Sequence, residues 1–427
     1  MQYTINAPDR LNTTIKLPAS KSMSNRALII HAISGGEIIP DNLSDCDDTE
    51  VMIAALHDMP DVIDIKAAGT AMRFMTAYLS ITKGEHTITG TERMKQRPIK
   101  TLVDALRYLG ADITYEGAEG FPPLHIKGKP LDGGYVEMMG NMSSQFISAL
   151  LMIGPALRNG MELKLTGEIF SRPYIDLTLW TMREFGADAE WTDVDTITVK
   201  PQPYISRKYL IENDWSASSY WYEAMALTKE RESTVRFEGL TDGSKQGDSV
   251  VRYIFSLLGV KTSFKTTQEG VPTTVTLSKH LRAVPRLDYD FINSPDLAQT
   301  VVVCCAAMGI PFHFTGLASL KIKETDRIEA LKTELHKLGF VIKDKNGCEL
   351  IWDGERCEPT MEPIDTYEDH RMAMAFAPAA IKYPGLKINN PQVVSKSYPK
   401  FWEDMREAGF KTSPDPSQGG ECLTDAK

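Results

Sequence analysis

The sequence predicts an α/β protein built from six repeated modules, and three observations support this. The chain has 427 residues, more than one ordinary hydrophobic core accommodates, which indicates two or more domains. A short polar head followed by an apolar helical run recurs six times, and an amphipathic helix ending in glycine recurs five times. Because both repeats have a nearly regular spacing, we interpret them as parts of one supersecondary module.

The first repeat is the polar head. With one marker residue for each head, the six heads lie at Ser22, Thr70, Ser144, Ala217, Asp296 and His370. The first interval, from 22 to 70, is 48 residues, and the later intervals are 73 to 79 residues. We therefore expect the first module to be shortened. The alternative interpretation is that the regular spacing of the heads is a coincidence, since small polar residues precede helices in many α/β proteins.

The second repeat is a helix that stops at glycine before a short strand, as glycine commonly does after the last helical turn. The five glycines are Gly110, Gly186, Gly259, Gly339 and Gly409. In the first module, Met59 and Pro60 stand where the others have glycine. Six such modules could direct their helix N-termini into shared clefts, and these ends attract anions.

The first head, SKSMSNR from Ser20, carries two cations at the start of an apolar run. A serine there is explained as a helix N-cap. Lys21 and Arg26 are not, because the positive end of a helix dipole disfavours cations. Both an ordinary cap and an anion-binding site remain open for this stretch.

Basic residues recur near the other heads, and two acids stand beside them. The basic residues are Lys21, Arg26, Arg73, Arg97, Arg172, Lys323, Arg327, Arg371 and Lys396. A solvated surface would explain any one of them, whereas the group together favours phosphate or carboxylate binding. Asp296 and Glu324 are either structural ion-pair partners or groups that transfer protons.

Composition narrows the class of protein. The net charge of −10 argues against a general nucleic-acid binder. The six cysteines show no CxxC or metal-like spacing, and we expect a reduced, cytoplasmic protein. No P-loop, GxGxxG motif, signal core or membrane-length apolar run is present. We expect residues 412–427 to form a disordered tail.

Nine motifs, in order, resemble the 5-enolpyruvylshikimate-3-phosphate synthases, a family of enolpyruvyl transferases. They are LPASKSMSNRAL, AGTAMR, MKQRPI, SSQF, SRPYID, PDLAQT, KETDRI, TYEDHRMAMAF and SKSYPKF. The resemblance runs from about Lys16 to Phe410. SKSxSNR and DHRMAM together are highly specific, whereas SSQF alone is weak.

The resemblance implies two hinged globular domains, each with three βαβαββ modules. One would span 20–212, and the other would join 1–19 to 213–411. The implied reaction moves the enolpyruvyl group of phosphoenolpyruvate to the 5-hydroxyl of shikimate 3-phosphate and releases phosphate, through a tetrahedral intermediate, in the shikimate pathway of aromatic amino acid biosynthesis. It implies no cofactor and no metal. We expect a monomer that binds neither nucleic acid nor a membrane.

The resemblance also implies roles for individual residues. Those expected at shikimate 3-phosphate are Lys21, Ser22, Arg26, Ser143, Ser144, Gln145, Ser171, Tyr174, Asp296 and Lys323. Those expected at phosphoenolpyruvate are Lys21, Gly69, Arg97, Gln145, Arg327, Arg371 and Lys396. Asp296 is expected to be the base on the 5-hydroxyl, and Glu324 and Lys21 are the candidates for protonating the methylene carbon. For His370, a role in the site and a role in orienting Asp369 both remain open.

The chain departs from the family pattern near Gly69 and again at Ser319. Lys66 and Ala67 replace the usual Gly and Asn, a strand pair before this motif is missing, and Ser319 stands where the family often has Asn. Two alternatives therefore stay open. One is a non-catalytic anion-binding homologue. The other is a UDP-aminosugar enolpyruvyl transferase, although its expected cysteine is absent from residues 67–97.

Overall fold

The computed structural model describes residues 1–266, 271–280 and 282–414. The chain divides into two compact units. Unit 1 contains Met1–Leu17, Trp215–Asp242 and the chain from Asp248 onward, and unit 2 contains Pro18–Asp214 and Gly243–Gly247. Each unit has its own core of buried apolar side chains. Each is described by itself below.

Three details differ from the boundaries expected from the sequence. The main segment of unit 2 begins at Pro18 and ends at Asp214, two residues beyond the expected 20–212 at each end. Gly243–Gly247 belongs to unit 2, because Ser244 Oγ and Gln246 Nε2 both donate hydrogen bonds to Glu212 Oε2, at 2.6 and 2.9 Å. Residues 412–414 are not part of a disordered tail, since strand β19 (Lys411–Pro414) pairs with β1 (Gln2–Asn6). The rest of the expected tail, 415–427, lies outside the described residues.

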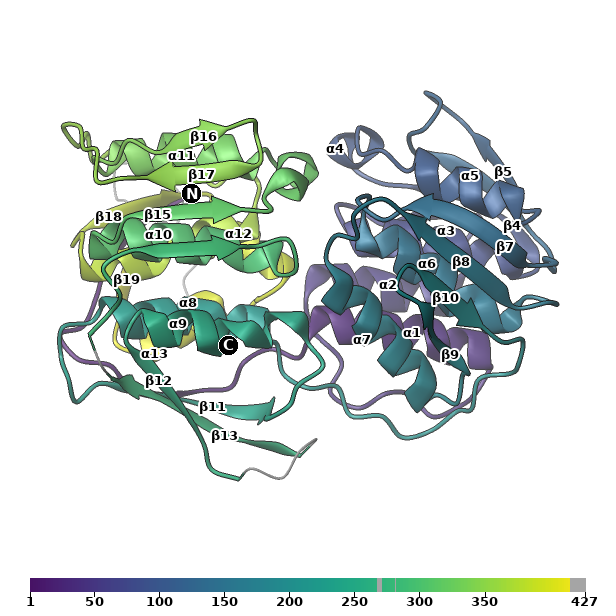
Figure 1. The fold of residues 1–427 in the computed structure, drawn as a ribbon, viewed down its shortest axis with the longest axis horizontal. Coiled ribbons are helices and arrows are strands. Elements are labelled where there is room, and N and C mark those ends of the chain that lie inside the picture. Colours follow the sequence, from purple (N-terminus) through teal and green to yellow (C-terminus); the bar gives the residue numbers. More distant parts are fainter. Residues whose placement is uncertain (267–270, 281, 415–427) are drawn as a thin grey trace, which may run out of the picture. The chain divides into compact units, whose positions relative to one another are not determined.

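The described residues of unit 1 form three sheets, and many of the elements are labelled in Figure 1. Its strands are β1 (Gln2–Asn6), β2 (Asn12–Ile15), β11 (Thr234–Thr241), β12 (Val260–Phe264), β13 (Pro272–Lys279), β14 (Leu287–Asp290), β15 (Phe312–Thr315), β16 (Lys343–Lys345), β17 (Glu349–Trp352), β18 (Leu386–Asn389) and β19 (Lys411–Pro414). Its helices are α8 (Trp215–Leu227), α9 (Val251–Leu257), α10 (Ala298–Met308), α11 (Arg327–Lys337), α12 (His370–Phe376) and α13 (Phe401–Glu407). Short 3-10 turns are η2 (Gly247–Val250), η3 (Pro295–Leu297), η4 (Ala318–Ile322), η5 (Ala377–Ile381) and η6 (Pro391–Lys396).

Unit 2 has two sheets. Its strands are β3 (Val62–Asp64), β4 (Gly84–Thr89), β5 (Asp112–Tyr115), β6 (Leu124–Gly128), β7 (Gly134–Met139), β8 (Met161–Thr166), β9 (Ala189–Asp193) and β10 (Thr196–Val199). Its helices are α1 (Lys21–Ser34), α2 (Asp47–Asp58), α3 (Gly69–Ile81), α4 (Glu92–Lys95), α5 (Lys100–Tyr108), α6 (Ser144–Ile153) and α7 (Arg172–Glu184), with a 3-10 turn η1 (Gly154–Ala156).

The four-stranded sheets share one topology, which confirms the repeated module. Within each module the spatial order of the strands is first, second, fourth, third, as in β14-β15-β17-β16 and β3-β4-β6-β5. The first two strands are parallel, and the last two are antiparallel additions. The sheet β18-β1-β19 has an equivalent arrangement, in which the N-terminal strand β1 takes the place of the fourth strand and a single parallel bridge from Ile364 to Ile388 takes the place of the first.

The shortened first module is visible in unit 2. Its helices α1 and α2 are joined by residues 35–46, which in this fully described stretch form no strand beyond an isolated bridge from Asp41 to Leu210. Helix α2 ends at Met59, which adopts φ 41°, the left-handed conformation that glycine usually supplies. The glycines that end the later helices also have positive φ, for example 100° at Gly110.

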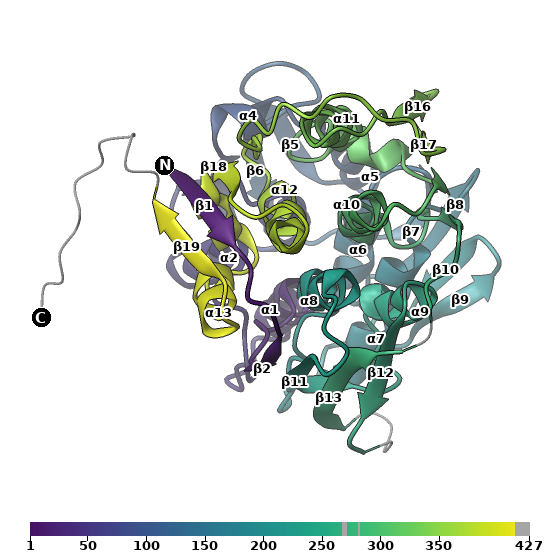
Figure 2. The same cartoon turned by 90° about the vertical axis from the view of Figure 1, so that its left-hand side faces the viewer.

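The helices that follow the polar heads form the centre of each unit. In α8, α10 and α12, nearly every residue is buried, because sheets and other helices cover all sides. Figure 2 shows these three helices end-on, with the sheets of unit 1 around them. Since each helix begins at a polar head, this packing brings side chains from several heads together.

Candidate active site

The sequence-predicted residues divide between the units. Unit 2 holds Lys21, Ser22, Arg26, Gly69, Arg97, Ser143, Ser144, Gln145, Ser171 and Tyr174, and unit 1 holds Asp296, Lys323, Glu324, Arg327, Arg371 and Lys396. In unit 2 they lie at or near the N-terminal ends of α1, α3, α6 and α7, and in the turn after α4. In unit 1 they lie in η3, at or near the starts of α11 and α12, and at the end of η6.

In the first head, a cap and a cation coexist. Ser20 is the N-cap of α1, and its Oγ accepts a hydrogen bond from the Met23 amide. Lys21 is the first helical residue, and its Nζ lies 3.2 Å from Oδ2 of Asp48, at the start of α2. Asp48, which the sequence patterns did not single out, is 27 residues away in the chain and compensates the cation at this positive helix end.

Arg26 is buried and held by neutral oxygens. Its Nε donates to Thr178 Oγ1 (2.7 Å), its Nη1 to the Ser22 carbonyl (2.8 Å), and its Nη2 to Ser148 Oγ (3.1 Å) and the Tyr174 carbonyl (3.3 Å). Burial lowers the pKa of Arg26 to about 10, although this still leaves the guanidinium charged at neutral pH. The sequence patterns did not indicate Ser148 and Thr178 as partners of Arg26, because these two residues and Arg26 lie on different helices.

The starts of α3 and α6 also meet. Gln145 Nε2 donates to Thr70 Oγ1 at 3.1 Å, and Ser143 caps α6 by accepting from the Gln145 amide. Arg97 lies against Gly69, because a Cβ on that glycine would come within 2.6 Å of Arg97 Nη1. Among the described residues, the buried Nε of Arg97 has no hydrogen-bond acceptor, so this arginine has a donor available for an anion.

Arg73, one of the basic residues near the heads that was assigned to neither substrate, links these same segments. Its Nη1 donates to the Gly69 carbonyl at 3.1 Å, and its Nη2 donates to the Pro98 carbonyl at 3.3 Å. It therefore supports both the start of α3 and the turn that carries Arg97. Its appearance in the motif AGTAMR was the one available signal.

Ser171 precedes α7 in a strained conformation. Its φ of 54° and ψ of 38° are left-handed, which is unfavourable for a non-glycine residue. The side chain makes no capping hydrogen bond to its own helix, and the residue is 9% exposed. Strained residues of this kind cluster at functional sites, which agrees with the predicted role of Ser171.

Asp296 is the centre of the cluster in unit 1. Its Oδ1 lies 3.2 Å from Arg327 Nη1 and 3.6 Å from Lys323 Nζ, and its Oδ2 lies 3.1 Å from Arg371 Nη2. Burial alone would raise the pKa of Asp296, but Arg371, Lys323 and Arg327 outweigh burial and hold it well below its usual range. In this state Asp296 is a carboxylate and a weak base.

Glu324 extends the same network. Its Oε2 lies 2.9 Å from Arg327 Nη2, and its Oε1 lies 3.0 Å from Lys396 Nζ. Arg327 Nε also donates to Asp369 Oδ2 at 2.7 Å. Burial would lower the pKa of Arg327, but Asp369, Glu324 and Asp296 raise it above its ordinary value. Both predicted acids thus pair with the cations expected to bind phosphoenolpyruvate.

Asp369 organises the start of α12. It is the N-cap and accepts from the Arg371 amide at 2.9 Å while it also binds Arg327. His370 Nδ1 lies 3.7 Å from Asp369 Oδ1, and His370 is buried. In the motif DHR, Asp369 therefore caps α12 and also connects the Arg327 side chain to the main chain of Arg371.

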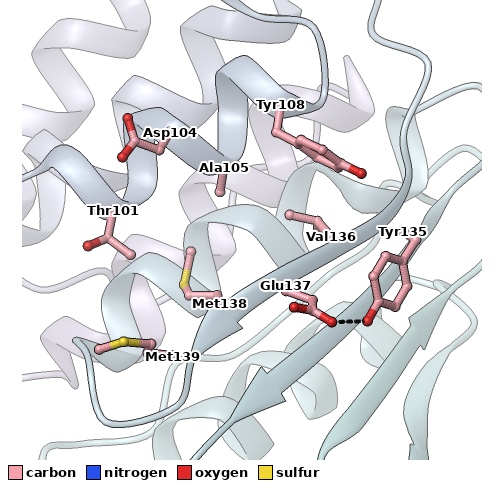
Figure 3. Close-up of a pocket in the computed structure, with 9 residues that line it drawn as sticks. All are labelled: Thr101, Asp104, Ala105, Tyr108, Tyr135, Val136, Glu137, Met138 and Met139. Atoms are coloured by element: carbon pink, nitrogen blue, oxygen red, sulfur yellow. Dashed lines mark hydrogen bonds between the residues drawn. The ribbon is translucent and has the colours of Figure 1, made fainter.

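A separate groove of about 620 Å³ lies between α5 and β7. Figure 3 shows its lining, which includes Tyr108, Tyr135 and Met139. The side chains that line it include none of the predicted site residues. The residues predicted to bind anions therefore lie at or near helix starts or in turns, and not in this groove.

Across the described residues, no group of three or more His, Cys, Asp or Glu side chains is arranged to hold a metal ion. In the same part of the chain, no helix is both long enough and apolar enough to cross a bilayer.

Comparison with known proteins identifies the class and then the family. The fold is that of the enolpyruvyl transferases: an EPSP synthase from Acinetobacter baumannii superposes with a TM-score of 0.77 over 97% of this chain and 100% of that chain, at 22% identity. The enolpyruvyl transferase NikO from Streptomyces tendae has a TM-score of 0.70 at 14% identity, over 97% of this chain and 99% of that chain.

Sequence relatives are more specific. A 3-phosphoshikimate 1-carboxyvinyltransferase from Bacteroides fragilis is 60% identical over 96% of this chain and 98% of its own length. One from Shewanella piezotolerans is 35% identical over 94% of this chain and 98% of its own. The family model of EPSP synthase (3-phosphoshikimate 1-carboxyvinyltransferase) matches residues 5–60 and 57–405. The chain belongs to the EPSP synthase family, which confirms the resemblance stated from its motifs.

Proposed function

We propose that this enzyme transfers the enolpyruvyl group of phosphoenolpyruvate to the 5-hydroxyl of shikimate 3-phosphate and releases phosphate. The observation that carries the proposal is the 60% identity over 96% of the chain to a relative named for this activity. The cations that each unit carries among the predicted site residues support it, because the two substrates together carry two phosphates and two carboxylates. Helix N-termini and arginines are suited to such groups.

Shikimate 3-phosphate is assigned to residues of both units by their motifs. They are Lys21, Ser22, Arg26, Ser143, Ser144, Gln145, Ser171, Tyr174, Asp296 and Lys323. In unit 2 most of these groups are hydroxyls and amides at helix starts, which donate hydrogen bonds to phosphate without adding charge. The strained conformation of Ser171 is consistent with this role.

Phosphoenolpyruvate is assigned to Lys21, Gly69, Arg97, Gln145, Arg327, Arg371 and Lys396. The available Nε of Arg97 beside the start of α3 supports a contact with an anion. The three cations of unit 1 are paired with Asp296 and Glu324 in this structure. An anion that binds them therefore has to share or displace those carboxylates.

This exchange gives Asp296 a route to its proposed role as a base. The cations around it keep its pKa low, and a bound anion adds negative charge that raises the pKa again. Asp296 can then accept the proton of the 5-hydroxyl of shikimate 3-phosphate, while the oxygen of that hydroxyl forms a bond to C2 of phosphoenolpyruvate. Glu324 or Lys21 supplies a proton to C3, which completes a tetrahedral intermediate.

Elimination reverses the proton transfer at carbon. C3 loses a proton to one of the same groups, the C2 to phosphate-oxygen bond breaks, and phosphate leaves with the bonding electron pair. The leaving phosphate takes up the proton that Asp296 accepted from the 5-hydroxyl, which returns Asp296 to its carboxylate form. These steps are balanced without oxidation or reduction.

We also propose that the enzyme works in the cytoplasm as a monomer, without nucleic acid or a membrane, in agreement with its net charge of −10.

A phosphate-release assay tests this function. We expect release that requires both phosphoenolpyruvate and shikimate 3-phosphate. A UDP-aminosugar in place of shikimate 3-phosphate should give none, and release with that acceptor would instead support the sister activity. No release with either acceptor, from protein with a cooperative melting transition, would support a non-catalytic homologue.

A further inference from the structure

We propose that Tyr220 is a positioning residue that holds Arg371 for phosphoenolpyruvate. This inference rests on the proposed function, because Arg371 is assigned to that substrate. Tyr220 lies on α8, 151 residues from Arg371 in the chain, and none of the family motifs includes it.

Both Tyr220 and Asp296 contact the Arg371 guanidinium. Its Nη1 donates to the Tyr220 hydroxyl at 3.3 Å and to the Asp296 main-chain carbonyl at 3.2 Å. Its Nη2 donates to Asp296 Oδ2 at 3.1 Å. Arg371 is 8% exposed, so these contacts decide the direction in which its remaining N–H groups point.

Tyr220 is a rigid point of attachment. Its side chain is 2% exposed, and its ring packs edge-on against Phe401 with a centroid separation of 5.8 Å and an interplanar angle of 77°. Helix α8 is tied to α10 by the contact between Ser219 Oγ and Thr300 Oγ1, at 3.2 Å. A tyrosine has only two side-chain torsions, so little entropy is lost in fixing its hydroxyl.

The charge of the partner distinguishes Tyr220 from Asp296. A bound anion and the Asp296 carboxylate compete for the same guanidinium, because both are negative. The Tyr220 hydroxyl is neutral and does not repel the anion. It can therefore keep Nη1 in place while Nη2 turns from Asp296 to the substrate.

Tyr220→Phe tests the inference by removing one oxygen atom. We expect the KM for phosphoenolpyruvate to rise about tenfold, with kcat and the KM for shikimate 3-phosphate within about twofold of wild type. Tyr222→Phe is the matched control. Tyr222 lies on the same helix, is 0% exposed, and its hydroxyl lies 2.8 Å from Thr262 Oγ1. The control should leave all three constants unchanged.

A double-mutant cycle identifies the residue through which Tyr220 acts. In an Arg371→Lys background, Tyr220→Phe should raise the KM for phosphoenolpyruvate by much less than tenfold, whereas independent effects would multiply. The gain in melting temperature on adding phosphoenolpyruvate with shikimate 3-phosphate provides a second measurement. It should be smaller for Tyr220→Phe than for Tyr222→Phe.

The outcomes separate this inference from the function on which it rests. A wild-type protein without transfer activity would refute the function. An active wild type with unchanged constants in Tyr220→Phe, equal effects of the two variants, or multiplying effects in the cycle would refute only the role of Tyr220. A loss of kcat without a change in KM would also contradict positioning of Arg371.

Discussion

Buried arginines of the predicted site are held by different kinds of partner in the two units. In unit 2, Arg26 donates to two hydroxyls and two carbonyls, all of them neutral. In unit 1, Arg327 contacts the carboxylates of Asp296, Glu324 and Asp369, and Arg371 contacts that of Asp296. Lys21 of unit 2, with Asp48, is intermediate between these cases.

This difference has a consequence for anion binding. The charge of Arg26 is not balanced by its hydrogen-bond acceptors, and burial lowers its pKa to about 10. The charge of Arg327 is more than balanced by the three carboxylates that it contacts, and these carboxylates raise its pKa. An anion therefore gains a largely uncompensated charge in unit 2, but has to compete with carboxylates in unit 1. The second arrangement couples substrate binding to the basicity of Asp296.

The largest effect is expected for Asp296→Asn, which removes the central carboxylate of unit 1. Turnover should fall by about 10²- to 10⁴-fold, the range typical of a general base, as measured by phosphate release. The melting temperature without ligand should also fall, because three cations lose their shared anion, and added inorganic phosphate should restore more of it than in wild type.

Asp288→Asn is the control for this prediction. It breaks an exposed ion pair with Arg286 in the same unit, outside the cluster, and should leave turnover intact. An Asp296→Asn enzyme with wild-type turnover would make Asp296 a purely structural partner. The comparison between the units would then no longer bear on catalysis.

The next effect is expected for Lys21→Ala in unit 2. Turnover should fall by about 100-fold or more if Lys21 neutralises substrate charge. Stability should change by only about 1 kcal/mol, because the lost pair with Asp48 is partly offset by removing a cation from a positive helix end. Phosphate release and thermal melting measure the two quantities.

Lys16→Ala removes an exposed lysine outside the predicted site and should change neither quantity. A fully active Lys21→Ala protein would reduce SKSMSNR to a helix cap. It would also remove the reason for treating unit 2 as part of the catalytic machinery.

The smallest effect concerns an acid of unit 1 that lacks a cation. Glu223 on α8 is 0% exposed, and among the described residues neither of its carboxylate oxygens has a hydrogen-bond donor. Burial raises its pKa well above the ordinary value, so the carboxyl is protonated in the folded state. Its cost to stability grows as pH rises above the unfolded pKa of about 4.3.

Glu223→Gln should therefore raise the melting temperature, and more at pH 8 than at pH 5, with a gain of about 1 kcal/mol at pH 8. Turnover should be unchanged, because Glu223 lies outside the cluster. A gain that is equal at both pH values would show that Glu223 is not buried in its neutral form. Thermal melting at the two pH values is the measurement.

The sequence by itself determined the repeat, the helix stops and most of the cluster members. The spacing of the heads and glycines required only local propensities, namely caps at helix starts and left-handed glycine at helix ends. The motifs supplied Asp296, Glu324, Arg327, Arg371 and Lys396, which the fold brings into one network. The 48-residue interval predicted a shortened first module, and the structure assigns that module no sheet of its own in the fully described unit 2.

Tertiary structure alone decided how these residues are paired. The acceptors of Arg26 lie 122 to 152 residues away on other helices, apart from those of its own turn, and Tyr220 lies 151 residues from Arg371. The strand order first, second, fourth, third is likewise a matter of which strands pair within each sheet, which the positions of the strands along the chain do not determine. Local sequence specifies where a helix begins, but contacts across such distances depend on how buried helices pack, which no short pattern encodes.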